Sequence, residues 1–109
     1  MLFRSIFEVW LKPERRQDYF DFASALRPEL EKIDGFISVE RFASLTQEGK
    51  ILSLSFWRDE KAVAAWRKHA LHREAQDAGQ SDIFADYRLR VVSVIRDYGM
   101  SDRGEAPEK

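Results

Sequence analysis

The chain has 109 residues, enough for one small domain with a substantial hydrophobic core. Its 18 basic and 19 acidic side chains leave a net charge of −1, which excludes the strongly basic surface that nucleic acids and anionic membranes require. The absence of cysteine excludes disulfides, thiol nucleophiles and zinc–thiolate sites.

The N-terminal run at residues 2–11 is dense in aromatic and branched side chains and predicts a strand. Charges at Arg4 and Glu8 interrupt this run, so it lacks the continuous apolar core of a signal peptide. No stretch of the sequence approaches the length of a transmembrane helix. We therefore expect a cytoplasmic protein that contacts neither membranes nor nucleic acids.

A helix and a pair of strands are predicted next. Apolar groups recur at helical spacing over residues 14–33, and Pro28 is expected to break or kink this helix. Residues 36–45 and 51–57 have the composition of strands, and the short polar segment 46–50 between them is typical of a hairpin. These two strands should therefore pair antiparallel.

A second helix and a last strand complete the predicted pattern. Asp59 is a suitable N-cap for a helix that Gly79 should end. Residues 81–87 are expected to add one short turn, and residues 88–96 to form the last strand. The predicted order is strand, helix, strand, strand, helix, strand.

This order describes an α+β fold of the ferredoxin-like βαββαβ type, with a four-stranded antiparallel sheet. We expect one domain over residues 1–99 and a loose polar tail over residues 100–109. Two helices cover only one face of such a sheet, yet the strands at 2–11 and 51–57 place apolar side chains on both faces. The simplest way to bury the uncovered face of the sheet is to pack it against a second copy of the chain, so we predict a homodimer that forms through the sheet.

Four segments carry a resemblance to a known family: GFISVERF (35–42), GKILSLSFWRDEKAVAAW (49–66), HREAQ (72–76) and VIRDYG (94–99). Over about residues 2–99, the chain resembles the antibiotic biosynthesis monooxygenase (ABM) family of dimeric α+β barrel proteins. The resemblance implies a homodimer whose sheets face each other, and a pocket between sheet and helices in each subunit. It also implies oxidation of an aromatic polyketide-like or quinol substrate by dioxygen, without flavin or metal.

A related branch of that family degrades haem with an asparagine, a tryptophan and a histidine. Trp66 stands where that branch keeps its tryptophan. The asparagine would fall near Phe7 or Glu8, but this sequence has no asparagine at all, and Gln76 stands at the position of the histidine. Haem degradation is therefore the less expected activity, and no cofactor is predicted.

The two histidines, His69 and His72, are the candidates for a general base, because histidine has its ordinary pKa near neutral pH. By the resemblance, His72 is the one to carry over, and we place it ahead of His69 because the family match spans its neighbours. On a helical wheel, His69 is the better placed, at the edge of a core-facing arc formed by Val63, Trp66 and Ala70. Arg73 is the nearest cation that could stabilise an oxyanion.

Aromatic side chains are expected to complete the site by holding a flat, hydrophobic substrate. The predicted substrate-binding residues are Trp66, Trp10, Phe7 and Phe56.

Structural interpretations of the same residues remain open. Trp66 also fits a core anchor, and the histidines also fit half-exposed helix positions. Two histidines without a third ligand make a weak metal site, so no metal is expected. The alternative to an enzyme is a non-catalytic dimer that binds a small hydrophobic ligand.

Overall fold

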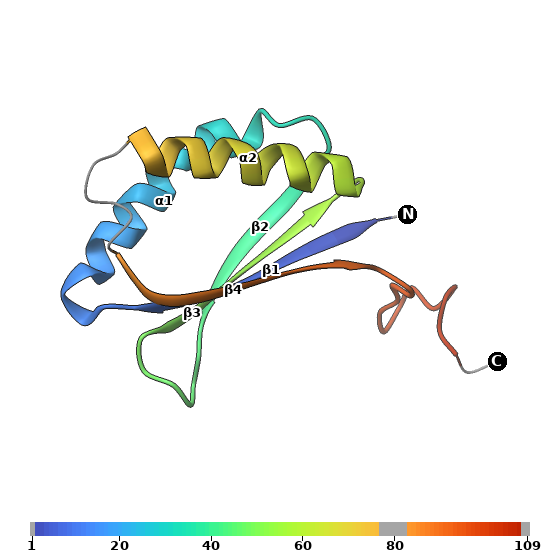
Figure 1. Cartoon of the computed structure of the whole chain (residues 1–109). Helices are drawn as coiled ribbons and strands as arrows, with labels where there is room; N and C mark the ends of the chain where they lie inside the picture. Colours follow the sequence, from blue (N-terminus) through green and yellow to red (C-terminus); the bar gives the residue numbers. More distant parts are fainter. Residues whose placement is uncertain (1, 77–82, 108–109) are drawn as a thin grey trace.

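The computed structural model describes residues 2–76 and 83–107 and has the ferredoxin-like architecture (Figure 1). A four-stranded antiparallel sheet has the strand order β2-β3-β1-β4, and both helices lie on one of its faces. The elements are β1 (Phe3–Leu11), a 3-10 turn (Pro13–Arg15), α1 (Arg16–Glu31), β2 (Phe36–Ala43), β3 (Lys50–Trp57), α2 (Glu60–Gln76) and β4 (Phe84–Ser93). The predicted α+β fold and its element order are confirmed.

The register of the sheet assigns alternate residues to its two faces. Phe7 lies opposite Ser53 on β3 and Leu89 on β4, and this row faces the helices. The next residue, Ile6, lies opposite Leu54 and Arg90 on the face away from the helices, which we call the open face.

Two separate hydrophobic clusters join the helices to the sheet. One contains Trp57, which is completely buried and packs edge-to-face against Phe36 at 5.4 Å. Its indole Nε1 donates a 2.7 Å hydrogen bond to Ser55, so burial of this polar group costs little. The members of the two clusters are Leu30, Trp57, Ala62 and Val63 in the first and Val9, Leu11, Tyr19, Ile51 and Ile83 in the second.

The beginning of α2 follows the prediction, whereas α1 does not. The Asp59 carboxylate accepts a 2.9 Å hydrogen bond from the Ala62 amide, which confirms it as the N-cap. This bond is the main reason why the pKa of Asp59 is lowered. The predicted break at Pro28 is wrong, because α1 continues through it to Glu31. An interior proline costs about 3 kcal/mol, and burial of Leu26 and Leu30 on either side offsets that cost.

Gly35 allows the chain to pass from α1 into β2 beneath the start of α2. Its φ of +96° lies in the left-handed region that favours glycine. A Cβ at this position would lie 2.7 Å from the Cβ of Ala62, which is too close for any side chain. The close approach of the two segments therefore requires glycine.

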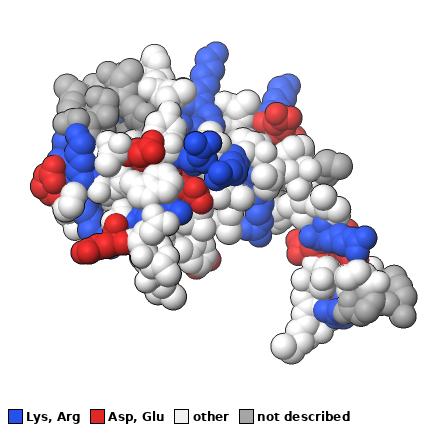
Figure 2. Space-filling view, turned by 60° about the horizontal axis from the view of Figure 1, so that its bottom comes forward, with Lys and Arg blue, Asp and Glu red and all other residues white. Residues whose placement is uncertain are grey.

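The C-terminal third departs from the prediction. The expected short turn at 81–87 is wrong for residues 84–87, because β4 begins at Phe84; residues 81 and 82, and Gly79 as the helix end, lie outside the described residues. Beyond β4, the tail extends away from the body of the molecule, as Figures 1 and 2 show. Its backbone folds back on itself, with the Gly99 amide donating to the Asp102 carbonyl at 2.8 Å and Ala106 buried. The looseness of the tail stays a prediction.

Candidate active site

A cavity lies between the helices and the middle of the sheet, in the space between the two hydrophobic clusters. The centres of water molecules could occupy a volume of about 80 Å³ inside it. Its floor is formed by Ser5, Ser53 and Ser55 on the two central strands, and these small side chains leave the space unfilled. The other lining residues are Phe7, Tyr19, Phe22, Ala23, Leu26, Leu30, Val39, Arg41, Trp66, Arg67, Ala70 and Phe84.

Aromatic rings from four elements line this cavity. Phe84 packs edge-to-face against Phe7 at 6.0 Å and against Tyr19 at 5.9 Å. Trp66 contributes a further ring from α2. These rings form an aromatic wall that can accept a flat ring by stacking or by edge contacts.

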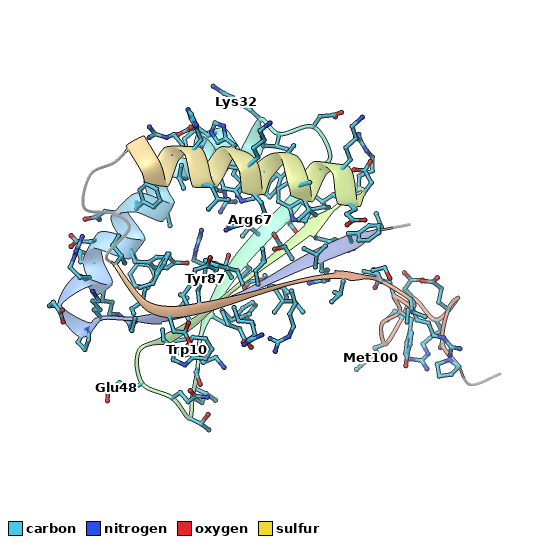
Figure 3. The ribbon with its side chains drawn as sticks, in the orientation of Figure 1. Trp10, Lys32, Glu48, Arg67, Tyr87 and Met100 are labelled. Carbon is cyan, nitrogen blue, oxygen red and sulfur yellow. The ribbon has the colours of Figure 1, made fainter. Side chains whose placement is uncertain are left out.

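Two arginines, Arg41 on β2 and Arg67 on α2, are the charged residues of the lining. Arg41 Nε donates a long, 3.4 Å hydrogen bond to the Tyr19 hydroxyl. The guanidinium carbon of Arg67 lies 5.1 Å from the ring centroid of Phe7. Figure 3 shows Arg67 extending from α2 toward the sheet, with Tyr87 of β4 directed into the same layer. Arg67 also borders a shallow groove that it shares with Tyr87 and Leu71.

Two of the predicted catalytic residues, His69 and Arg73, lie where α2 meets α1. Nε2 of His69 lies 2.7 Å from Oε1 of Glu29, and Nε of Arg73 lies 3.3 Å from the same oxygen. The His69 ring stacks on Trp66, with 5.7 Å between the ring centroids and 29° between the planes. Trp66 therefore contacts His69 and also lines the cavity.

Glu29 is the acidic centre of this cluster. Its pKa is lowered, chiefly by the hydrogen bond from His69 and with a further contribution from the charge of Arg73. As an ionised acceptor, Glu29 holds the His69 ring through Nε2, in the position where it stacks on Trp66. No local pattern in the sequence indicates this pair, because its members are forty residues apart.

His72 lies on the exposed side of α2, and the described cavity lining contains neither histidine. The helical wheel correctly separated the two positions: Val63 and Ala70 are buried, His69 is half-buried and His72 is exposed. The roles assigned to His72, His69 and Arg73 remain predictions.

The four aromatic residues that were predicted to bind the substrate lie on both faces of the sheet. Phe7 and Trp66 line the cavity, but Trp10 and Phe56 belong to rows that face away from the helices. Figure 3 shows Trp10 on that opposite side. The grouping of all four residues around one substrate is therefore wrong, because neighbours in sequence alternate between the two faces of a strand.

Sequence reasoning missed three features of the cavity: the serine floor, the two arginines and Tyr19. A signal for the floor was present in LSLS at 52–55, where the serines fall on the helix-facing side and the leucines on the other. No comparable local signal marks Arg41 and Arg67, because they come from elements that meet only in the folded chain.

Other kinds of site find no support in the described part of the chain. Within residues 2–76 and 83–107, no group of three or more histidine, aspartate or glutamate side chains is arranged to hold a metal ion. None of the described helices is long and apolar enough to cross a membrane.

Similarity to known proteins was found in sequence and in structure. Residues 2–78 match the family model described as antibiotic biosynthesis monooxygenase. The jasmonate monooxygenase ABM of Pyricularia oryzae is 48% identical over 93 residues, which are 85% of this chain but only 43% of that protein. The chain thus spans less than half of this relative's length.

Two solved structures from Mycobacterium tuberculosis share the fold at low sequence identity. One protein superposes with a TM-score of 0.75 at 17% identity, over 91% of this chain and all of the other. A heme-degrader with two hemes bound superposes with a TM-score of 0.70 at 15% identity, over 89% of this chain and 99% of the other. At such identities the likeness concerns the fold alone. The match over residues 2–78, more than half of the sequence, shows that the chain belongs to the antibiotic biosynthesis monooxygenase family.

Proposed function

We propose that this chain is a cofactor-independent monooxygenase that oxidises an aromatic polyketide-like or quinol-type substrate in the cavity beneath α1 and α2. The observation that carries this proposal is the aromatic cavity, with Phe7, Phe84 and Trp66 in its lining, in a chain of this family. A monooxygenase with this fold needs a site that holds a ring in contact with dioxygen and away from bulk water.

The chemistry balances without an external reductant. Loss of a proton from a phenol or an activated carbon gives an electron-rich anion that can reduce dioxygen. For an activated methylene group the overall change is R₂CH₂ + O₂ → R₂C=O + H₂O, in which the substrate carbon supplies all four electrons. The protein must then provide a base, an orienting pocket and stabilisation of the anion.

We assign the base to His69 rather than to His72. The 2.7 Å contact with Glu29 supports this choice, since a carboxylate bound to one ring nitrogen orients the imidazole and leaves its other nitrogen available for proton transfer. The stacking of His69 on Trp66 also brings it nearer to the cavity wall than the exposed His72. In this assignment Arg73 helps to position Glu29.

Oxygen uptake with a panel of hydroquinones, anthrones and jasmonate tests the proposal, and Ser53→Leu tests its location. Leucine at the cavity floor should fill the space and lower kcat/KM at least tenfold, while overpacking costs roughly 1–3 kcal/mol of stability. Ser24→Leu on the exposed side of α1 is the matched control and should retain full activity. Equal activity of both variants would move the reaction away from this cavity, and no uptake with any substrate would refute the monooxygenase.

The second candidate, a non-catalytic module that binds a hydrophobic ligand, is favoured by the position of both histidines outside the described cavity lining. Under this alternative, ligands would protect the protein against thermal unfolding without oxygen uptake. Measurement of both quantities on the same compounds separates the two functions.

A homodimer through the open face is also proposed. Leu52, Leu54 and Phe56 lie there, and Figure 2 shows uncharged side chains interspersed with charged ones where this side is turned forward. Some of the charges on this face are paired within the chain: Glu8 lies 3.7 Å from Lys50 and 3.3 Å from Arg90. A partly neutralised, partly apolar sheet face can pack on its own copy.

Leu54→Asp should convert the dimer to a monomer. A carboxylate in the middle of each paired face would lose its hydration and meet its own copy. Sedimentation is expected to give twice the 12.8 kDa chain mass for the parent and 12.8 kDa for the variant. Leu45→Asp, at a fully exposed position between β2 and β3, is the control that should remain dimeric. A monomeric parent at micromolar concentration would contradict this proposal.

A further inference from the structure

The lining of the cavity carries positive charge with no acidic residue among its described members. Arg41 and Arg67 contribute two guanidinium groups, and the other lining residues are apolar or neutral. We propose that the substrate carries a carboxylate, which these two arginines bind while its ring lies against the aromatic wall. This inference rests on the proposed function and specifies the substrate class of the same site.

The sheet brings the two arginines to one part of the cavity. Arg41 lies opposite Ser53, and Ser53 lies opposite Phe7, so the three form one row across β2, β3 and β1. Neighbouring strands are about 4.8 Å apart, which puts the backbones of Arg41 and Phe7 at roughly 10 Å. The Arg67 guanidinium lies over Phe7 and thus at the other end of this row. Because Ser53 between them is small, it leaves room above the sheet for an anion, and both arginines line the cavity there.

Neither arginine lies within ion-pair distance of a carboxylate among the described residues; Arg4 and Arg16 likewise contact aromatic rings, but they do not line the cavity. Five arginines elsewhere lie within ion-pair distance of a carboxylate: Arg15, Arg27, Arg58, Arg73 and Arg90. In the part of the chain that the structure describes, Arg41 instead contacts the Tyr19 hydroxyl and Arg67 contacts the ring of Phe7. Two cations that face one apolar cavity repel each other, and an anionic ligand would relieve this repulsion.

The rest of the lining indicates what accompanies the carboxylate. Phe7, Phe84 and Trp66 offer only ring surface, and the serines of the floor can make a few hydrogen bonds. A small acid with one flat or compact apolar ring would satisfy both parts of the site. Binding of the carboxylate by the two guanidinium groups would also hold the ring in one orientation. Oxidation at a single carbon requires such a fixed orientation.

Calorimetric titration of the full chain with 2-naphthoate and with the neutral 2-naphthamide tests the inference. These ligands share a ring and differ in charge, so the parent should bind the carboxylate at least tenfold more tightly, and less so at high salt. Arg41→Gln and Arg67→Gln should each weaken carboxylate binding roughly tenfold, as expected for one charge-assisted hydrogen bond. Neither change should affect binding of the amide much.

Arg27→Gln removes one positive charge from an exposed position on α1 and is the matched control, with unchanged affinity for both ligands. Lysine at position 41 or 67 should restore part of the carboxylate preference, because it keeps the charge but loses the planar fork. Should either glutamine variant fail to fold, the preference of the parent and its salt dependence still decide the question. Equal affinity of the parent for acid and amide, or equal losses in Arg27→Gln, would overturn the inference.

Failure here is distinguishable from failure of the proposed function. Carboxylate preference without oxygen uptake on any compound would uphold the anion site and refute the monooxygenase. Oxygen uptake with neutral quinols that is insensitive to Arg41→Gln and Arg67→Gln would uphold the monooxygenase and refute the carboxylate.

Discussion

Alanine at His69 is expected to reduce turnover roughly 10²–10⁴-fold, the usual effect of removing a general base. The substitution should leave the fold intact, because the ring is half-exposed and packs mainly on one face of Trp66. The binding of a substrate analogue should change little, since the described cavity lining does not include His69. Steady-state oxygen uptake, together with the affinity for an inert ligand, separates a loss of turnover from a loss of binding.

His72→Ala is the control for this experiment, and we expect the opposite effect on turnover from it. The His72 side chain is exposed on α2, so its removal should preserve both turnover and stability. Loss of activity in His72→Ala with an active His69→Ala would support the carry-over from the family instead. Two fully active variants would remove histidine from the mechanism altogether.

The largest effect on stability is expected at Trp57. Truncation to alanine should lower the free energy of unfolding by roughly 3–5 kcal/mol, because it empties the centre of one hydrophobic cluster. It would remove the contact with Phe36 and leave the Ser55 hydroxyl without its 2.7 Å donor. Chemical denaturation followed by circular dichroism, which does not depend on the missing indole fluorescence, measures the change.

Trp66→Ala is the matched comparison, and its cost in stability should be clearly smaller. Trp66 is half-buried at the edge of the cavity, whereas Trp57 is fully buried. The substitution should impair substrate binding instead, because it removes part of the aromatic wall. An equal loss of stability in both variants would show that Trp66 is a core anchor of the same kind as Trp57.

Local patterns in the sequence were sufficient for the fold class and for most elements. Strand alternation and helical spacing report which side chains can be buried together, and this constraint acts over a few residues. The N-cap at Asp59 and the buried arc of α2 were predicted correctly for the same reason. The predicted break at Pro28 was wrong because burial of Leu26 and Leu30 by the sheet outweighs a local preference, and α1 continues to Glu31. At β4, pairing with β1 extends the strand back to Phe84, where the local sequence had suggested a turn.

The sequence by itself determined the order of the elements, the faces of the central strands and the presence of space on one of them. The serines at positions 53 and 55 are visible in the sequence, and the alternation of side chains along the strand places both on the same face of the sheet. Only the tertiary structure decided what surrounds that space. Glu29 meets His69 because α1 packs beside α2, and Arg41 shares a cavity with Arg67 because strand register and helix packing bring distant segments together. Such contacts arise from the pairing of whole elements, which no short stretch of the sequence encodes.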